Sequence, residues 1–133
     1  MLLAQIMANQ GELDQASHIV KELISEEKFN PGAYYLSALI EQEKGNFKEA
    51  CENLKRAVYL KPQFVLGHFA LANLSRQEGR IREFRKHSEN ALHYLSAFRD
   101  EEILDQSEGL SAGRLREIIH TITRMEEIGE KAA

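Results

Sequence analysis

Residues 31–64 read PGAYYLSALIEQEKGNFKEACENLKRAVYLKPQF, and the pattern of this stretch recurs on both sides of it. Its central glycine, Gly45, has counterparts 34 residues away in each direction, at Gly11 and Gly79. A fixed period of about 20–50 residues is typical of chains built from one repeated supersecondary unit. The sequence therefore predicts an array of repeats.

The positions around the three glycines also agree in residue type. Two residues after each glycine comes a bulky apolar side chain, and seven residues before each comes an alanine: Leu13, Phe47 and Ile81, and Ala4, Ala38 and Ala72. Glycine suits a helix end, because left-handed backbone carries little steric penalty there. Alanines at 38, 50, 57 and 72 let helices cross closely, and Tyr34, Phe47, Leu54 and Leu60 are expected to fill the space around those crossings.

Each repeat is predicted to be a pair of helices, at about 1–10 and 13–26, 31–44 and 47–60, and 65–78 and 81–96. Asn46 is expected to cap the helix after it, with Glu49 reaching back as in a capping box, and Pro62 ends that helix. The acidic segment 97–110 follows. Ser111 then resembles an N-cap, and Leu115, Ile118, Ile119, Ile122 and Met125 form one apolar stripe of a last helix.

These features resemble the tetratricopeptide repeat (TPR), and residues 31–64 resemble it most closely. The flanking repeats depart from the pattern at Lys28, Phe84 and Ser96. The resemblance implies an all-α superhelix of three antiparallel helix pairs, over 1–30, 31–64 and 65–96. The acidic segment 97–110 would connect it to a C-terminal capping helix at 111–129, which covers the apolar face that a last repeat exposes.

Residues 107–118 (SEGLSAGRLREI), 57–64 (AVYLKPQF) and 67–74 (GHFALANL) are similar to the C-terminal TPR extension of CheR-type chemotaxis receptor methyltransferases. In such proteins an N-terminal domain uses S-adenosylmethionine to methylate receptor glutamates, and the TPR part makes protein contacts. Because the sequence begins inside a hairpin and shows no strand-and-glycine pattern for S-adenosylmethionine, we expect a fragment without the catalytic domain. The alternative is a TPR scaffold or adaptor in another bacterial assembly or signalling system.

Composition favours a cytoplasmic protein with protein partners. The net charge of −4 gives no general attraction to nucleic acid or to an anionic membrane. Cys51 is the only cysteine, so no internal disulfide can form and a reducing compartment fits. No run approaches the roughly 18 apolar residues that a membrane helix needs. We expect neither nucleic acid nor membrane as a partner.

The resemblance to TPR proteins places the partner-binding groove on the first helix of each pair. The groove residues that it implies are Tyr35, Leu39, Gln42, Phe69, Asn73, Arg76 and Gln77, whereas Leu36 and Ala70 are expected to pack between helices. TPRs that clamp a C-terminal carboxylate use lysine, arginine and asparagine there, and only Asn73 matches that clamp. An apolar groove with a few amides suits a protein helix or extended segment, for which the candidates are a chemoreceptor or its signalling partner.

An enzyme is the competing class, and no catalytic residue, cofactor site or metal site is expected. The five histidines show no paired spacing on one helix face, and Cys51 fits a buried small hydrophobe better than a nucleophile. A basic cluster (Arg76, Arg80, Arg82, Arg85 and Lys86) is open to three interpretations: a site for RNA or an acidic protein, a solvated surface, or a partner for segment 97–110. We expect that segment to lie ordered on the third repeat, with Phe98, Ile103 and Leu104 as apolar anchors.

Overall fold

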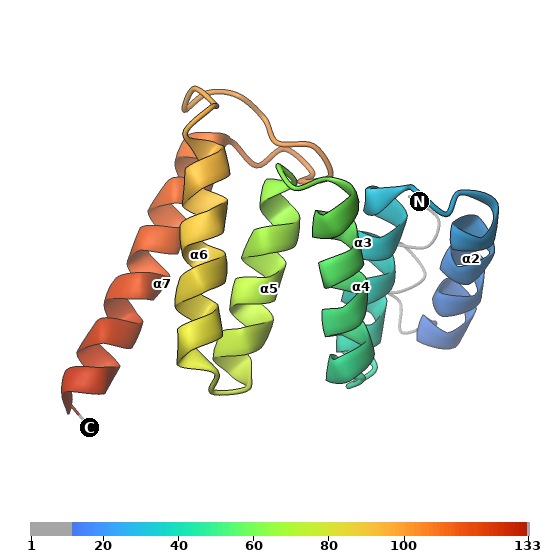
Figure 1. Cartoon of the computed structure of the whole chain (residues 1–133), viewed down its shortest axis with the longest axis horizontal. Coiled ribbons are helices and arrows are strands. Elements are labelled where there is room, and N and C mark those ends of the chain that lie inside the picture. The colour runs from blue at the N-terminus through green and yellow to red at the C-terminus, as the bar shows by residue number, and fades with distance from the viewer. Residues whose placement is uncertain (1–11, 133) are drawn as a thin grey trace. The chain divides into compact units, whose positions relative to one another are not determined.

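The computed structural model describes residues 12–132, and these form helices joined by short turns and one longer segment (Figure 1). The helices are α2 (Leu13–Glu26), α3 (Pro31–Glu43), α4 (Phe47–Leu60), α5 (Val65–Gln77), α6 (Ile81–Leu95) and α7 (Ala112–Ala132). Residues 12–132 contain no strand beyond an isolated antiparallel bridge between Ile103 and Ser111. The all-α prediction is confirmed. The helix predicted at 1–10 lies outside the described residues.

The chain divides into two compact units, Met1–Gly67 and His68–Ala133. The first holds α2, α3, α4 and the first residues of α5, and the second holds the rest of α5 with α6 and α7. The five described repeat helices begin where the sequence predicted and end within one residue of the predicted position. The assignment of residues 1–30, 31–64 and 65–96 to three repeats stays a prediction.

Glycines end the first helix of the two described hairpins, as the 34-residue period predicted. Gly45 has a φ of +84° and Gly79 a φ of +74°, in the left-handed region that side chains rarely adopt. After each, the backbone turns back on the helix: the Asn46 N–H donates to the Glu41 carbonyl, and the Arg80 N–H to the Ser75 carbonyl, both over 2.8 Å. The period therefore marks two turns of the same kind.

Small residues predicted to lie at helix crossings are buried in the first unit. Ala38, Ala50 and Ala57 are fully buried, and so is Leu54 between them. A second cluster, Ala16, Val20, Leu36 and Ile40, joins α2 to α3, with Ile19 and Ile24 packed against it. Burial of these apolar side chains stabilises the packing of α2, α3 and α4 by about 25 cal/mol per Å² of apolar surface removed from water.

Two expectations for the turn between α3 and α4 are wrong. Phe47 is 40% exposed and does not fill the space at the crossing. The Asn46 side chain does not cap α4, because its amide donates instead to the carboxylate of Glu41 over 2.7 Å. Glu41 is 1% exposed, and a buried carboxylate without hydrogen bonds is costly. The hydrogen bond from Asn46 to this carboxylate therefore stabilises the fold more than a cap on α4 would.

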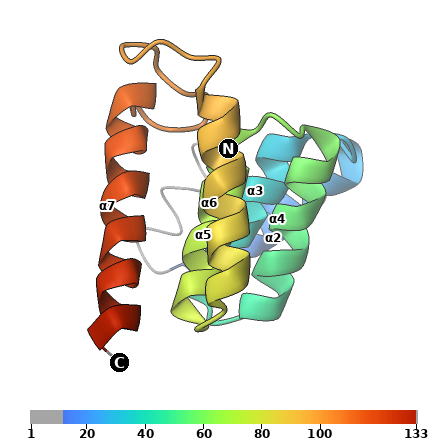
Figure 2. The same cartoon turned by 60° about the vertical axis from the view of Figure 1, so that its left-hand side comes forward.

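In the second unit α7 packs alongside α6 (Figure 2). The Ser111 hydroxyl accepts a hydrogen bond from the Arg114 N–H over 3.2 Å, which confirms Ser111 as the N-cap. Leu115 and Ile119 are buried and Ile118 and Ile122 are half-buried, as the stripe predicted. Met125 is 58% exposed, so the buried stripe stops short of it.

Segment 97–110 is ordered, and one of its three predicted apolar anchors is wrong: Leu104 is buried and Phe98 is half-buried, but Ile103 is exposed. Leu104 is 5% exposed and its N–H donates to the Leu110 carbonyl, whereas Ile103 is 57% exposed. The two are neighbours in extended backbone, so their side chains point to opposite sides and only one can be buried.

Three carboxylates of segment 97–110 pair with arginines outside the predicted basic cluster. Glu101 and Glu102 lie near Arg99, and Asp100 pairs with Arg116 of α7. The cluster meets α7 instead, because Arg76 pairs with Glu126 and Arg85 with Glu130; Arg80 pairs with its neighbour Glu78. α7 lies along α6, so its C-terminal carboxylates reach the cluster first.

Candidate functional site

The first-unit part of the predicted groove is one face of α3. Tyr35, Leu39 and Gln42 are spaced four and three residues apart, which places them on the same side of a helix. All three are half-buried, whereas the adjacent Leu36 is 2% exposed and packs inside, as expected. The Tyr35 ring meets the Phe64 ring edge-on, with centroids 5.2 Å apart, and this contact fixes the tyrosine in place.

The second-unit part is one face of α5. Phe69, Asn73 and Gln77 follow one another at four-residue intervals. Phe69 and Asn73 are half-buried and Gln77 is exposed, while Ala70 is 8% exposed and packs inside. This face therefore offers one aromatic ring and two amide groups.

Arg76, which the sequence analysis placed in the groove, is held by an ion pair that the sequence did not predict. Its guanidinium lies 3.6 Å from the Glu126 carboxylate of α7, and the side chain is only 32% exposed. An arginine held by a carboxylate attracts an external anion less than a free one does. Arg76 therefore contributes shape and hydrogen-bond donors to the α5 face more than net charge.

The structure brings the predicted site residues together in two sets. Tyr35, Leu39 and Gln42 share a face in the first unit, and Phe69, Asn73 and Gln77 share a face in the second. One continuous groove that includes both faces stays a prediction. Each face alone carries one half-buried aromatic ring and at least one amide group: Gln42 on α3, and Asn73 and Gln77 on α5.

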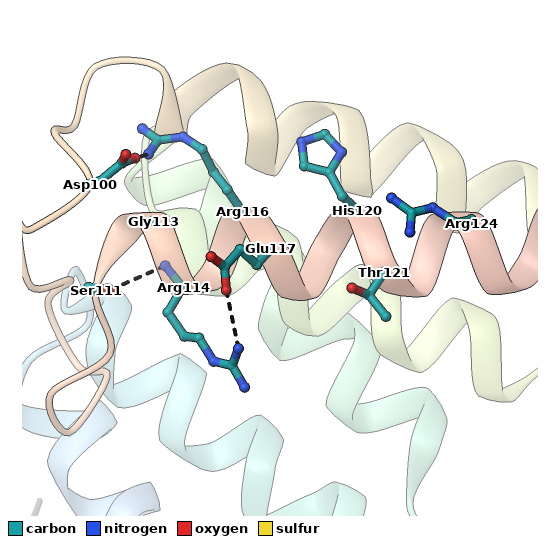
Figure 3. Close-up of a pocket in the computed structure, with 9 residues that line it drawn as sticks. All are labelled: Asp100, Ser111, Gly113, Arg114, Arg116, Glu117, His120, Thr121 and Arg124. Carbon is teal, nitrogen blue, oxygen red and sulfur yellow. Dashed lines mark hydrogen bonds and ion pairs between the residues drawn. The ribbon is translucent and has the colours of Figure 1, made fainter.

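A polar hollow on α7 was missed by the sequence reasoning (Figure 3). It has a volume of about 730 Å³ and is lined by Asp100, Ser111, Gly113, Arg114, Arg116, Glu117, His120, Thr121 and Arg124. Residue spacing could have predicted part of it, because Arg116, His120 and Arg124 recur every four residues and so share one face of a helix.

The cations of this hollow are partly neutralised from within. Arg114 pairs with Glu117 at 3.2 Å, and Arg116 pairs with Asp100 (Figure 3). Arg116 also donates to the Leu95 and Phe98 carbonyls over 2.6 Å each, which ties α7 to the end of α6. The hollow therefore has a structural role in holding segment 97–110, and we assign no ligand to it.

Residues that carry chemistry are scattered in the described part of the chain. Within residues 12–132, no three histidine, cysteine or carboxylate side chains gather closely enough to hold a metal ion. Cys51 is a free thiol and is half-buried, less enclosed than expected. His68 is 7% exposed, and its ring stacks on the Tyr94 ring with centroids 5.3 Å apart. None of the helices described is long and apolar enough to span a membrane.

Comparison with known proteins shows the type of fold. Residues 31–64 match the tetratricopeptide repeat family. The type III secretion translocator chaperone SycD of Yersinia enterocolitica is similar in structure, with a TM-score of 0.80 at 12% identity, over 96% of this chain and 89% of SycD. SycD in complex with a peptide of the translocator YopD gives a TM-score of 0.78 at 13% identity, over the same shares. The sequence has no match among curated proteins.

A second group of similar structures is formed by MamA proteins. MamA from Desulfovibrio magneticus RS-1 gives a TM-score of 0.67 at 15% identity and aligns with 71% of this chain. The chain spans 53% of the length of that MamA structure. The family match and these likenesses together show a helical-repeat fold of the tetratricopeptide type.

Proposed function

We propose that this chain is a non-catalytic module that binds a segment of another protein on the first helices of its hairpins. The observation that carries the proposal is the exposure pattern of α3 and α5. Each buries one face and leaves a partly or fully exposed stripe with an aromatic ring and one or two amide groups: Tyr35, Leu39 and Gln42, and Phe69, Asn73 and Gln77. Apolar stripes with a few amides suit an amphipathic helix or an extended apolar segment.

The likeness to SycD supports a peptide as the ligand. SycD shares the fold over 96% of this chain, and one of its structures holds a peptide of YopD. At 13% identity the likeness does not carry over the particular partner, so only the class of ligand is proposed for this chain.

The finer proposal is that the chain is the TPR region of a chemotaxis-type protein-glutamate methyltransferase in the cytoplasm. Its support is the resemblance of residues 57–64, 67–74 and 107–118 to that group. The partner would then be a chemoreceptor or its signalling partner. A methyltransferase domain encoded upstream of residue 1 supports this proposal, and its absence from the gene contradicts it.

The alternative is a TPR scaffold or adaptor in another bacterial assembly or signalling system. The specific observation that favours it is the likeness to SycD and to MamA. The two proposals differ in cofactor chemistry of the parent protein and not in the binding surface, because both place the ligand on α3 and α5.

Selection from a peptide library tests the binding surface and does not require the natural partner. The library displays 16-residue peptides, and the bait is the full 133-residue chain. Enriched peptides should carry apolar residues at helical or alternating spacing. They should lose about tenfold or more in affinity for Phe69→Ser and for Tyr35→Ser, in keeping with truncation of aromatic anchors.

The matched control is Lys48→Ala, which changes an exposed side chain on α4. Its affinity for the selected peptides should stay within about twofold of the wild type, because exposed contacts outside an interface contribute little. Peptides that bind all three variants alike would contradict the proposed surface.

A further inference from the structure

A hollow of about 460 Å³ opens in the first unit, where the turn between α2 and α3 meets the last turns of α4. Its lining consists of three aromatic residues, three cationic residues and one leucine: Phe29, Tyr34, Tyr59, Lys28, Lys55, Arg56 and Leu60. We call it the Phe29–Tyr59 hollow. Its residues come from α4, from the turn and, in the case of Tyr34, from α3, and none of them belongs to the α3 stripe of Tyr35, Leu39 and Gln42.

Two aromatic side chains of this hollow are almost fully open to solvent. Phe29 is 82% exposed and Tyr59 is 84% exposed. Single exposed apolar side chains are ordinary on a protein surface, but neighbouring ones that line one concavity indicate an interaction site. Tyr34 forms the floor: it is 7% exposed, and its hydroxyl donates to the Lys28 carbonyl over 3.1 Å. The floor is therefore held in place before anything binds.

The charges of the hollow have one sign. Among the described residues, Lys28, Lys55 and Arg56 form no ion pair, and no carboxylate lines the hollow. The Arg56 guanidinium lies 5.9 Å from the centre of the Tyr34 ring, which orients it over the floor. The chain as a whole has a net charge of −4, so this local positive charge opposes the overall balance.

We propose that the Phe29–Tyr59 hollow binds a protein segment in which a bulky apolar side chain is flanked by carboxylates. The apolar side chain covers the two exposed rings and removes them from water. The carboxylates meet the lysines and the arginine at the rim, where charge complementarity sets the orientation of the segment and the rate of encounter. The chain then has a second docking surface, independent of the α3 and α5 faces.

A neighbouring hollow argues for a peptide over a single-stranded nucleic acid. Glu26 and Glu27 line that second hollow, which shares Lys28 and Phe29 with the first. A nucleic acid carries a negative charge at every nucleotide and needs a cationic groove about four or more nucleotides long. The two glutamates interrupt such a path directly beside Phe29. A short acidic motif around one apolar side chain needs only the three cations.

Fluorescence anisotropy with a defined probe tests the proposal on the full chain. The probe is the fluorescein-labelled peptide Gly-Asp-Asp-Phe-Glu-Asp-Gly, and its control has alanine in place of phenylalanine. We expect saturable binding of the probe with a Kd below about 1 mM. The double variant Lys55→Glu, Arg56→Glu should weaken it by about tenfold or more, because two attractions become repulsions. Binding of the probe to the Tyr59→Ser variant, and binding of the alanine peptide to the wild type, should each be several-fold weaker than binding of the probe to the wild type, because one apolar contact is lost.

Matched controls separate this surface from loss of folding and from the proposed groove. Lys48→Glu reverses an exposed charge in the first turn of the same helix and should change the Kd by about twofold at most in 0.15 M salt. Phe69→Ser, which alters the α5 face, should leave probe binding unchanged. Circular dichroism melting verifies that each variant is folded, and amide shifts in NMR spectra should be confined to residues 28–34 and 55–60.

Four results would overturn the proposal. They are absence of saturable binding, equal binding by the Lys55→Glu, Arg56→Glu variant, tighter binding of a ten-residue oligouridylate at the same residues, and self-association that Tyr59→Ser abolishes. The third result would assign the hollow to nucleic acid, and the fourth would assign it to a second copy of the chain.

Discussion

The carboxylate of Glu41 on α3 accepts a hydrogen bond from the hydroxyl of Ser17 on α2 over 3.1 Å, and both side chains are buried. The same carboxylate accepts from the Asn46 amide over 2.7 Å and lies 3.9 Å from the Lys44 ammonium. Lys44 also meets Asp14 of α2 at 3.2 Å, and this hydrogen bond raises the pKa of the lysine. Polar contacts therefore join α2 to the end of α3, beside the apolar cluster that these helices share.

Ser17→Ala should destabilise the chain, because it removes one donor from a buried carboxylate. Loss of a partner that leaves a buried polar group unsatisfied costs about 1–3 kcal/mol. The free energy of unfolding from urea titration measures it. Ser25→Ala makes the same change at an exposed position of the same helix and should cost less than about 0.5 kcal/mol. Equal stabilities for the two variants would show that the Ser17 hydroxyl contributes nothing to holding Glu41.

Two glycines of α7 should respond in opposite ways to alanine. A Cβ at Gly113 would lie 2.9 Å from the Asp100 Cβ and 3.1 Å from the Asp100 carbonyl oxygen, so backbone would have to move. Gly113→Ala should therefore destabilise by about 1–3 kcal/mol, as overpacking does. A Cβ at Gly129 meets nothing within 4 Å, and Gly129→Ala should stabilise by about 0.5–1 kcal/mol. Thermal melts of both variants show whether each substitution raises or lowers the melting temperature. A higher melting temperature for Gly113→Ala would contradict the close contact of segment 97–110 with α7.

The anchoring of segment 97–110 should depend on Leu104 and not on Ile103. Leu104 is 5% exposed and Ile103 is 57% exposed, so only Leu104→Asp places a carboxylate in an apolar site. Hydrogen exchange measured at residues 102–112 should accelerate in Leu104→Asp and stay near the wild-type rate in Ile103→Asp. Equal acceleration in the two variants would mean that the segment is not anchored by one side of its backbone.

Glu102 should titrate below the ordinary range for a glutamate. The Arg99 backbone N–H donates to its carboxylate over 3.1 Å, and together with a weaker bond from the Arg99 side chain this lowers the pKa of Glu102. Because the pKa in the folded state is the lower one, ionised Glu102 adds stability that is present above its unfolded pKa and is lost as the pH falls through the folded pKa.

Carbon-13 NMR titration of the Glu102 carboxyl group measures this shift directly. In Arg99→Ala the backbone donor remains, so the pKa of Glu102 should rise but stay below its ordinary value of 4.5. A wild-type pKa of 4.5 or above would contradict the hydrogen bond from the backbone.

The helices of this fold could be predicted closely from local signals, and the errors occur where tertiary contacts override those signals. Gly45 and Gly79 predicted helix ends, because a turn after a helix often needs one residue in left-handed backbone and glycine adopts it readily. Both glycines are in that conformation. Asn46 has the sequence pattern of a helix cap, yet its amide donates to the carboxylate of Glu41. The burial of Glu41 causes this, and residue spacing does not predict that burial. Phe47 is 40% exposed, although its apolar type and its place in the repeat predicted burial.

The surfaces were less predictable than the helices. The resemblance to TPR proteins indicated Tyr35 together with Leu39, and the structure places both on one face of α3. The Phe29–Tyr59 hollow joins a turn to residues 30 positions later, and periodicity says nothing about such a pairing. The partners of Arg76 and Arg85 were also missed, because they depend on how far α7 extends along α6.

Affinity for one selected peptide, measured by isothermal titration against Tyr35→Ser, Phe69→Ser and Lys48→Ala, tests protein binding by the α3 and α5 faces most directly. The predicted result is a loss of about tenfold or more for each aromatic variant and at most about a twofold change for Lys48→Ala, with all three folded by circular dichroism. Wild-type affinity in both aromatic variants would contradict binding at these faces.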